Sequence, residues 1–183
     1  EVATIVLPTG TGKTETMLVA TLADKATRTL VIVPSIELKN QIADKYATWG
    51  ILRKLGVVTK ETLNPSVLIL NKTLESDENI EDIKSADIII STPAFFARAT
   101  SEIQLKIKDI FSHVFFDEAH HVTADTYQKI MKHFSPKLWL GMTATPDKRD
   151  DNVAGRNVYE LFNYQIAYEI RLQQAMEENL LCP

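Results

Sequence analysis

A short apolar run, residues 2–7, leads directly into a glycine-rich turn that ends in a lysine and a threonine. The turn reads Pro8, Thr9, Gly10, Thr11, Gly12, Lys13 and Thr14. Glycines allow the backbone to turn tightly and to bring its N–H groups close to an anion. A helix that starts at the end of such a turn adds free N–H groups and the positive end of its dipole. The pattern predicts a strand, a phosphate-binding loop and a helix in succession.

The loop departs from the strict phosphate-loop pattern at its first position, where Leu7 replaces a glycine. An ordinary tight turn before a helix is the alternative interpretation. The sequence Gly-x-Gly-Lys-Thr after a strand favours nucleotide binding. In that interpretation Lys13 offers its ammonium to the β- and γ-phosphates, and the Thr14 hydroxyl is a ligand of Mg²⁺.

The composition limits the class of protein but does not identify it. The 183 residues suffice for one domain with a full core, and 45% hydrophobic with 24% charged residues is ordinary for a globular protein. A net charge of −4 argues against binding of nucleic acid by bulk positive charge, although a local basic groove stays open. Apolar runs fall short of the roughly 20 residues that cross a bilayer, so we expect no membrane association. The single cysteine, Cys182, predicts no intrachain disulfide and fits a cytoplasmic location.

Strand-like and helix-like segments alternate along the chain, which predicts an α/β fold: a three-layer parallel sheet flanked by helices. The expected strands are residues 2–7, 29–33, 67–70, 87–91, 113–116, 139–142 and 165–170. The expected helices are residues 14–26, a helix capped by Ser35 and stopped by Gly50, residues 126–134 and residues 172–179. The acidic stretch 75–82 is expected to be a solvated loop or a short helix.

A second polar motif follows the apolar segment 113–116. Asp117 and Glu118 stand where a strand ends, which is the ligand-binding edge of an open α/β sheet. We expect Asp117 to hold Mg²⁺ opposite Thr14, and Glu118 to polarise the attacking water as general base. A solvated turn is the alternative. The neighbouring His120 and His121 lack the further ligands of a zinc site, so one is expected to face the nucleotide or a partner domain.

The loop at residues 8–14, the Asp117-Glu118-Ala119-His120 box and the Thr143-Ala144-Thr145-Pro146 segment occur here in the order found in superfamily 2 helicases and translocases. The chain resembles the first RecA-like, ATP-binding domain of that superfamily. It is similar to the branch that holds type I and type III restriction-enzyme motor subunits and helicase-like repair proteins. The narrower likeness lies in residues 140–146, 159–162 and 170–181.

The resemblance implies roles for further residues. Pro34 and Ser35, and then Thr92 and Pro93, resemble two elements that touch the sugar-phosphate backbone of nucleic acid. A plain strand exit with a helix cap is the alternative for Pro34 and Ser35. Residues that couple the ATP state to nucleic-acid binding would be His120, Thr143, Ala144 and Thr145. Lys148 and Asp151 depart from the Arg and Gly that the family often has, which weakens any phosphate clamp at those positions.

An arginine finger accelerates phosphoryl transfer by about 10³- to 10⁵-fold. In this superfamily it comes from a second RecA-like domain, and Arg149, Arg156 and Arg171 stand in no recognisable finger context. We therefore expect residues 1–183 to be a fragment that binds ATP and Mg²⁺ but hydrolyses ATP poorly without that second domain.

The implied function is ATP hydrolysis coupled to movement along nucleic acid, with DNA favoured over RNA by the subfamily likeness. Two alternatives stay open: the motor part of a restriction endonuclease, and a nucleotide-gated binding or scaffold module without motor activity. Base preference is only inferred, because no adenine-specifying glutamine motif can be assigned.

Overall fold

The computed structural model describes residues 1–71, 77–97, 100–121, 124–147 and 157–181. These residues form one sheet in the strand order β3-β4-β2-β5-β6-β1-β7. Every neighbouring pair is parallel. The strands are β1 (Val2–Val6), β2 (Thr29–Ile32), β3 (Val67–Ile69), β4 (Ile88–Ser91), β5 (His113–Phe116), β6 (Leu138–Thr143) and β7 (Ile166–Glu169). The predicted α/β parallel sheet is confirmed.

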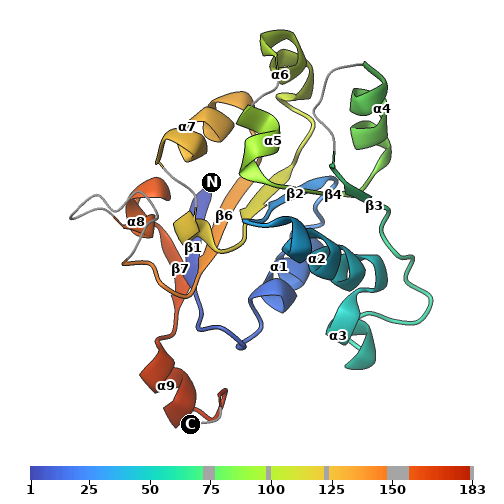
Figure 1. The fold of residues 1–183 in the computed structure, drawn as a ribbon. Helices are drawn as coiled ribbons and strands as arrows, with labels where there is room; N and C mark the ends of the chain where they lie inside the picture. The colour runs from blue at the N-terminus through green and yellow to red at the C-terminus, as the bar shows by residue number, and fades with distance from the viewer. Residues whose placement is uncertain (72–76, 98–99, 122–123, 148–156, 182–183) are drawn as a thin grey trace.

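Helices cover both faces of the sheet (Figure 1). One apolar cluster packs side chains of α1 (Lys13–Ala23), α2 (Ile36–Thr48), α3 (Gly50–Lys54) and α9 (Leu172–Glu177) against the sheet. The other packs α4 (Asp77–Ser85), α6 (Ser101–Ile107), α7 (Ala124–His133) and α8 (Val158–Leu161). Phe95 of α5 (Pro93–Ala97) packs at the margin of this second cluster, and a 3₁₀ turn, η1 (Ala119–His121), follows β5.

The central strands are buried on both sides, as parallel strands covered by helices are. In β2, Leu30 and Ile32 belong to one apolar cluster, whereas Val31 and the following Val33 belong to the other. This alternation follows from the two-residue period of a strand. It makes β2 a shared wall of both cores, which fixes the position of the residues that leave its carboxyl end.

Several local expectations can be compared with the structure. Ser35 caps α2, since the Leu38 N–H donates to Ser35 Oγ at 3.4 Å. Gly50 is not the end of that helix as expected: α2 ends at Thr48, Trp49 takes a left-handed conformation with φ 59°, and Gly50 begins α3. Trp49 is buried, and its indole N–H donates to the Leu63 carbonyl, so tertiary packing holds its backbone there.

The short helices α3, α5 and α8 were not expected, because four or five residues show no helical period in the sequence. The acidic stretch forms a helix over Asp77–Ser85, in the part of that stretch that the structure describes. Among the described residues, no helix has the length and apolar character needed to cross a membrane.

Candidate nucleotide-binding site

The glycine-rich turn between β1 and α1 forms an open cradle. Gly10 has φ 89° and Gly12 has φ 95°, a left-handed conformation that favours glycine. Gly12 stands immediately before α1. The Pro8 carbonyl accepts hydrogen bonds from the Thr11 hydroxyl at 2.7 Å and from the Thr11 N–H at 3.3 Å. These bonds close the base of the turn.

The turn borders a cavity of about 600 Å³, within the size range of small-molecule sites. We call it the phosphate cavity. It lies where β1 and β5 end, so the carboxyl ends of two strands on either side of β6 supply polar groups to it. Its lining residues are Thr9, Gly10, Thr11, Gly12, Lys13, Thr14, Glu15, Leu38, Lys45, Ile51, Asp117, Glu118 and Leu180. Of the loop residues predicted to bind nucleotide, only Pro8 is outside this lining.

Lys13 and Glu118 meet in the cavity as an ion pair. The Lys13 Nζ lies 2.7 Å from Glu118 Oε1, and both side chains are largely withdrawn from solvent. Among the described residues, neither Lys13 Nζ nor Glu118 Oε2 has a hydrogen-bond partner of good geometry, although both atoms are buried. Buried polar atoms are normally satisfied. Both atoms therefore have capacity for a further hydrogen bond.

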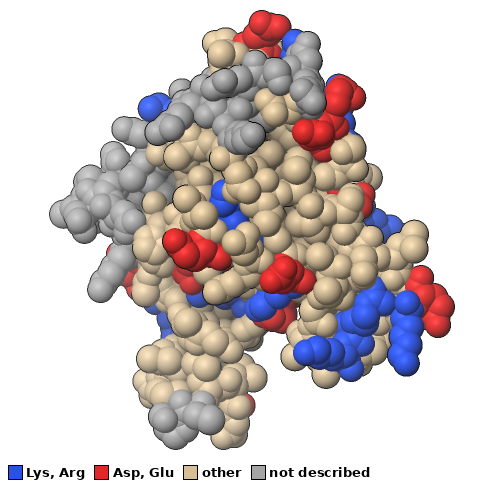
Figure 2. Space-filling model, turned by 45° about the vertical axis from the view of Figure 1, so that its right-hand side comes forward, with Lys and Arg blue, Asp and Glu red and all other residues tan. Residues whose placement is uncertain are grey.

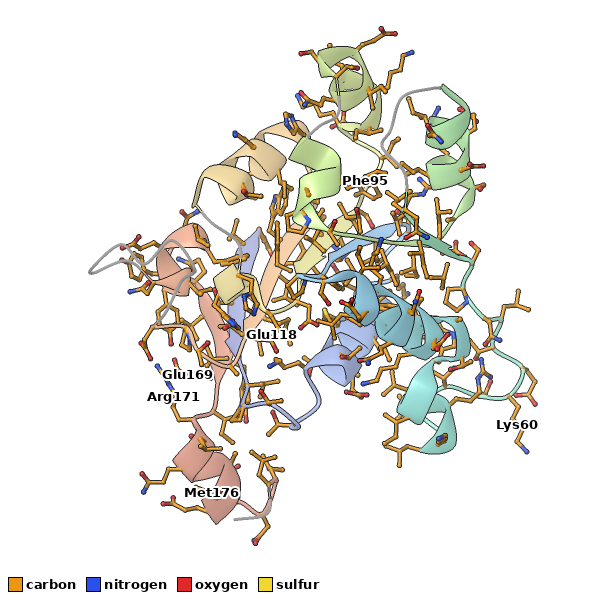
Figure 3. The ribbon with its side chains drawn as sticks, viewed as in Figure 1. Lys60, Phe95, Glu118, Glu169, Arg171 and Met176 are labelled. Carbon is orange, nitrogen blue, oxygen red and sulfur yellow. The ribbon has the colours of Figure 1, made fainter. Side chains whose placement is uncertain are left out.

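Glu118 owes its position to an unusual backbone conformation. Its φ is 47°, which a residue other than glycine adopts uncommonly and at a conformational cost. Its N–H donates to Asp117 Oδ1 at 3.1 Å, and the Asp117 N–H donates to the Ile32 carbonyl of β2. In Figure 3, Glu118 lies near the centre of the molecule, at the sheet edge beside the glycine-rich turn.

Asp117 carries the strongest electrostatic signal in the cavity. Burial and, to a smaller extent, the adjacent Glu118 charge raise the pKa of Asp117 to about 6, while Lys13 acts in the opposite direction. A carboxyl group destabilised in this way binds a cation favourably, because the cation supplies the missing positive charge. The side chain suits a hard, oxygen-seeking ion such as Mg²⁺.

The predicted coupling residues lie beside this pair. His120 Nδ1 is 3.0 Å from Thr143 Oγ1 and 3.5 Å from Glu118 Oε2. The Thr145 N–H donates to the same Thr143 hydroxyl at 3.1 Å, and Ala144 lies between the two threonines. Thr143, at the end of β6, is fully buried. Thr145 is exposed, so its own hydroxyl is not part of this buried contact.

A second cavity, of about 430 Å³, lies at the ends of β2 and β4. We call it the Ser35 cavity. It brings together all four residues predicted to touch nucleic acid, from two separate parts of the sequence: Pro34, Ser35, Thr92 and Pro93. His121 lines it as well, and its ring lies 4.1 Å from that of His120, centroid to centroid. His121 thus joins the Ser35 cavity to His120, which contacts Glu118 of the phosphate cavity.

Some lining residues were missed from the sequence. Leu38, Lys45, Ile51 and Leu180 reach the phosphate cavity from helices or turns that carry no motif. Lys45 pairs with Glu15 at 2.7 Å, which fixes α2 to α1. No sequence signal places Leu38, Lys45 or Ile51 in the cavity, and the family likeness of residues 170–181 gave Leu180 no role, because tertiary packing brings each of them there.

Among the described residues, no arginine lines the phosphate cavity, so none is placed to act as an arginine finger. Arg171 is engaged in other contacts: it lies 2.8 Å from Asp147 and contacts Tyr159 and Glu169, and Figure 3 places it beside Glu169, just past the carboxyl end of β7. Arg149, Arg156 and the departures at Lys148 and Asp151 lie outside the described residues. His113 is buried and lies 2.7 Å from Asp24 Oδ2 and 2.9 Å from Ser112 Oγ, contacts within the fold and away from the phosphate cavity.

Comparison with known families decides the classification. The sequence model of the family described as "Type III restriction enzyme, res subunit" matches residues 1–148, most of the chain. The chain belongs to this family. The res-subunit family match includes both the glycine-rich turn and the Asp117-Glu118 pair, so it covers every polar residue of the phosphate cavity.

Individual relatives agree with the res-subunit assignment. The chain is 29% identical over 150 residues to the DNA 3'-5' translocase XPB2 of Sulfurisphaera tokodaii, covering 80% of this chain and 27% of that protein. The Hef helicase domain of Pyrococcus furiosus superposes with a TM-score of 0.62 at 24% identity, over 92% of this chain and 35% of that one. The UvsW helicase of bacteriophage T4 gives 0.59 at 16% identity, over 91% and 54%. The structural likenesses show a shared fold.

The superfamily 2 helicase type is thereby confirmed, and the chain is a RecA-like domain of that type. It spans about a quarter of the curated translocase that it matches.

Proposed function

We propose that this chain binds ATP with Mg²⁺ in the phosphate cavity and hydrolyses it as part of a motor that moves along DNA. The observation that carries the proposal is the ion pair between Lys13 and Glu118, whose Nζ and Oε1 atoms lie 2.7 Å apart in the phosphate cavity. Gly10 and Gly12, both in a left-handed conformation, line the same cavity. A cation, a carboxylate and a backbone cradle at one sheet edge are the groups that phosphoryl transfer needs.

The residues fit the metal that such a site uses. The Thr14 hydroxyl and the Asp117 carboxylate both line the cavity, and they are oxygen donors of the kind that Mg²⁺ prefers. The raised pKa of Asp117 supports this assignment, because burial and the neighbouring Glu118 disfavour its negative charge and a bound cation would offset them. Bound Mg²⁺ would neutralise charge on the β- and γ-phosphates and on Asp117.

The Lys13–Glu118 pair suggests how binding prepares hydrolysis. An arriving triphosphate competes with Glu118 for the Lys13 ammonium, because both are anions that need the same cation. Once Lys13 turns to the phosphates, the Glu118 carboxylate is released to accept a proton from the attacking water. The backbone N–H groups around Gly10 and Gly12 and the start of α1 hold the phosphates meanwhile.

The Ser35 cavity is the proposed track for nucleic acid. Hydroxyl groups and N–H groups at helix starts bind phosphates without reading bases, which suits a motor that moves over any sequence. DNA is favoured because the similar translocase is named for DNA. Movement would require a second RecA-like domain, which would also supply an arginine finger. We further propose a cytoplasmic location, supported by the sparse use of cysteine.

The test uses the full-length protein with the substitution Glu118→Gln. Loss of the base should lower DNA-stimulated ATP turnover by about 10²-fold or more. ADP affinity should be kept or raised, because a neutral amide no longer competes for Lys13. Lys13→Ala should weaken ADP binding itself. Unchanged turnover in Glu118→Gln would reject the assignment of Glu118, and a wild-type protein without any ATPase activity would favour the scaffold alternative.

The motor part of a restriction endonuclease remains a second candidate, favoured by the description of the matching family. Nuclease activity would have to come from a partner or from a further domain. DNA cleavage that depends on ATP and disappears in Lys13→Ala would support this candidate.

A further inference from the structure

Besides Leu38 and Ile51, the phosphate cavity has an apolar wall next to the glycine-rich turn that the catalytic groups do not explain. Leu180 lines the cavity although half of its surface, 52%, is exposed. Its neighbour Leu181 touches the glycine-rich turn: its Cδ2 would lie 3.3 Å from a Cβ built on Gly10. The two leucines therefore reach the phosphate loop from the opposite end of the sequence.

This wall is a built element of the fold. Ala175 of α9 is fully buried, and its carbonyl accepts hydrogen bonds from the Leu180 N–H at 2.8 Å and from the Leu181 N–H at 3.3 Å. Asn179 turns the chain with φ 57°. Such a turn is a common way to end a helix and orients the residues that follow. Figure 1 shows α9 and the chain end below the loop that joins β1 to α1.

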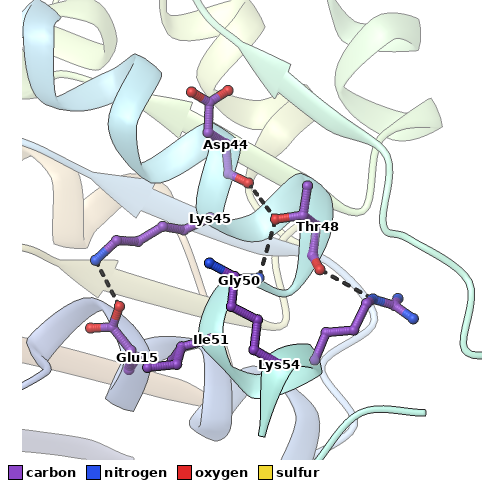
Figure 4. Close-up of a pocket in the computed structure, with 8 residues that line it drawn as sticks. Glu15, Asp44, Lys45, Thr48, Gly50, Ile51 and Lys54 are labelled. Carbon is purple, nitrogen blue, oxygen red and sulfur yellow. Dashed lines mark hydrogen bonds and ion pairs between the residues drawn. The ribbon is translucent and has the colours of Figure 1, made fainter. Parts of the chain in front are cut away.

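The opposite side of the cavity is charged. There Lys45 and Glu15 point toward one another, and behind them lies a separate cavity of about 640 Å³ with Arg53 and Lys54 in its lining (Figure 4). Figure 2 shows a cluster of Lys and Arg side chains on one side of a hollow. The lobe formed by α9, whose surface in this view is mostly uncharged, lies on the other side. The two sides of the hollow thus differ in chemistry.

A nucleotide has the same two-sided character: an anionic phosphate chain and an apolar aromatic base. With phosphates on Gly10, Gly12 and Lys13, the base needs an apolar surface beside the loop, and Leu180 provides one that carries no charge. We propose that Leu180 forms the subsite for the base of the bound nucleotide, held in place by Leu181 against Gly10. This inference rests on the proposed nucleotide-binding function.

The experiment separates base from phosphate by comparing two probes, ADP and pyrophosphate, each with Mg²⁺, by calorimetric titration of the full-length protein. Leu180→Ala should weaken ADP binding by about five- to tenfold, the expected effect of removing one apolar contact surface. Pyrophosphate binding should stay unchanged, because this ligand has no base. Leu180→Phe should retain or tighten ADP binding, since a larger apolar face remains.

Leu172→Ala is the matched control, because Leu172 is exposed on α9, the helix that precedes Leu180, but does not line the cavity. It should change neither affinity. Equal weakening of both probes by Leu180→Ala would overturn the inference, since the leucine would then act only by shaping the loop. Unchanged ADP binding would overturn it as well. Failure of the wild-type protein to bind either probe would instead reject the proposed function, and Lys13→Ala, which should weaken both probes, identifies the binding site.

Discussion

His120 Nδ1 lies 3.0 Å from the hydroxyl of Thr143, whose carbonyl accepts the N–H of Leu7 at 2.9 Å. One residue at the end of β6 therefore contacts both the acidic motif after β5 and the start of the glycine-rich turn after β1. Since β6 lies between β5 and β1 in the sheet, this double contact follows from the strand order. A shift of either element would therefore change a contact of Thr143.

Thr143→Val should uncouple the two cavities. Valine keeps the shape but removes the hydroxyl that His120 and the Thr145 N–H share, so stability should fall by about 1–2 kcal/mol. Stimulation of ATP turnover by DNA should drop sharply, while turnover without DNA changes little. Both rates are measured on the full-length protein. Thr59→Val, at an exposed threonine that contacts only Thr62 through its hydroxyl, is the control, and an unchanged stimulation ratio in Thr143→Val would contradict the proposed coupling.

Ser35→Asp separates helix capping from nucleic-acid binding. Aspartate caps a helix as well as serine does, so the thermal stability of the protein should be nearly unchanged. Its negative charge in the Ser35 cavity should weaken DNA binding by about fivefold or more at low salt, and less at high salt. Fluorescence anisotropy with a labelled oligonucleotide measures this. Thr100→Asp is the matched control, because Thr100 caps α6 through the Ile103 N–H and is absent from the lining of that cavity.

Asp117→Asn tests how much the buried negative charge of Asp117 destabilises the protein when neither nucleotide nor Mg²⁺ is present. The pKa of Asp117 is raised from 3.8 to about 6, so the folded state binds its proton more tightly than the unfolded state. This contribution to stability is complete below pH 4 and is lost as pH rises through 6. The neutral asparagine avoids the loss. The variant should therefore be more stable than the wild type at pH 7, by up to about 3 kcal/mol, and similar at pH 4.

Urea denaturation at the two pH values measures this difference. A stability difference that does not grow with pH would contradict the raised pKa. Saturating Mg²⁺ should make the wild type more stable than the variant at pH 7, because only the Asp117 carboxylate offers the metal a negatively charged ligand.

Gly141→Ala tests the packing under β6. A Cβ at Gly141 would lie 2.3 Å from Cζ of the fully buried Phe162, far inside contact distance. We expect a loss of about 1–3 kcal/mol from overpacking, measured by denaturant unfolding. Phe162→Leu alone removes ring contacts, but in combination with Gly141→Ala it should recover part of that loss. Additive effects of the two substitutions would contradict this prediction, because they would show that the loss does not come from contact with the Phe162 ring.

The sequence predicted those features that depend on local chemistry. Ser35 as a cap, Gly10 and Gly12 in the turn, and Asp117 at a strand end each follow from one residue type and its neighbours. Helices of four or five residues, such as α3, were missed because packing of Leu52 and Trp49 decides them. The left-handed backbone of Glu118 has no signal either, since glutamate carries no preference for that conformation. The approach of Leu181 to Gly10 joins the two ends of the chain, which no local pattern can indicate.

The ion pair between Lys13 and Glu118 has a consequence for turnover. Glu118 is an internal anion that competes with every phosphate ligand for one ammonium, whether that ligand is arriving or leaving. In the proposed function, the same competition would act on ADP after hydrolysis and would shorten its residence. The carboxylate proposed to activate water would then also promote product release and reset the site for the next cycle.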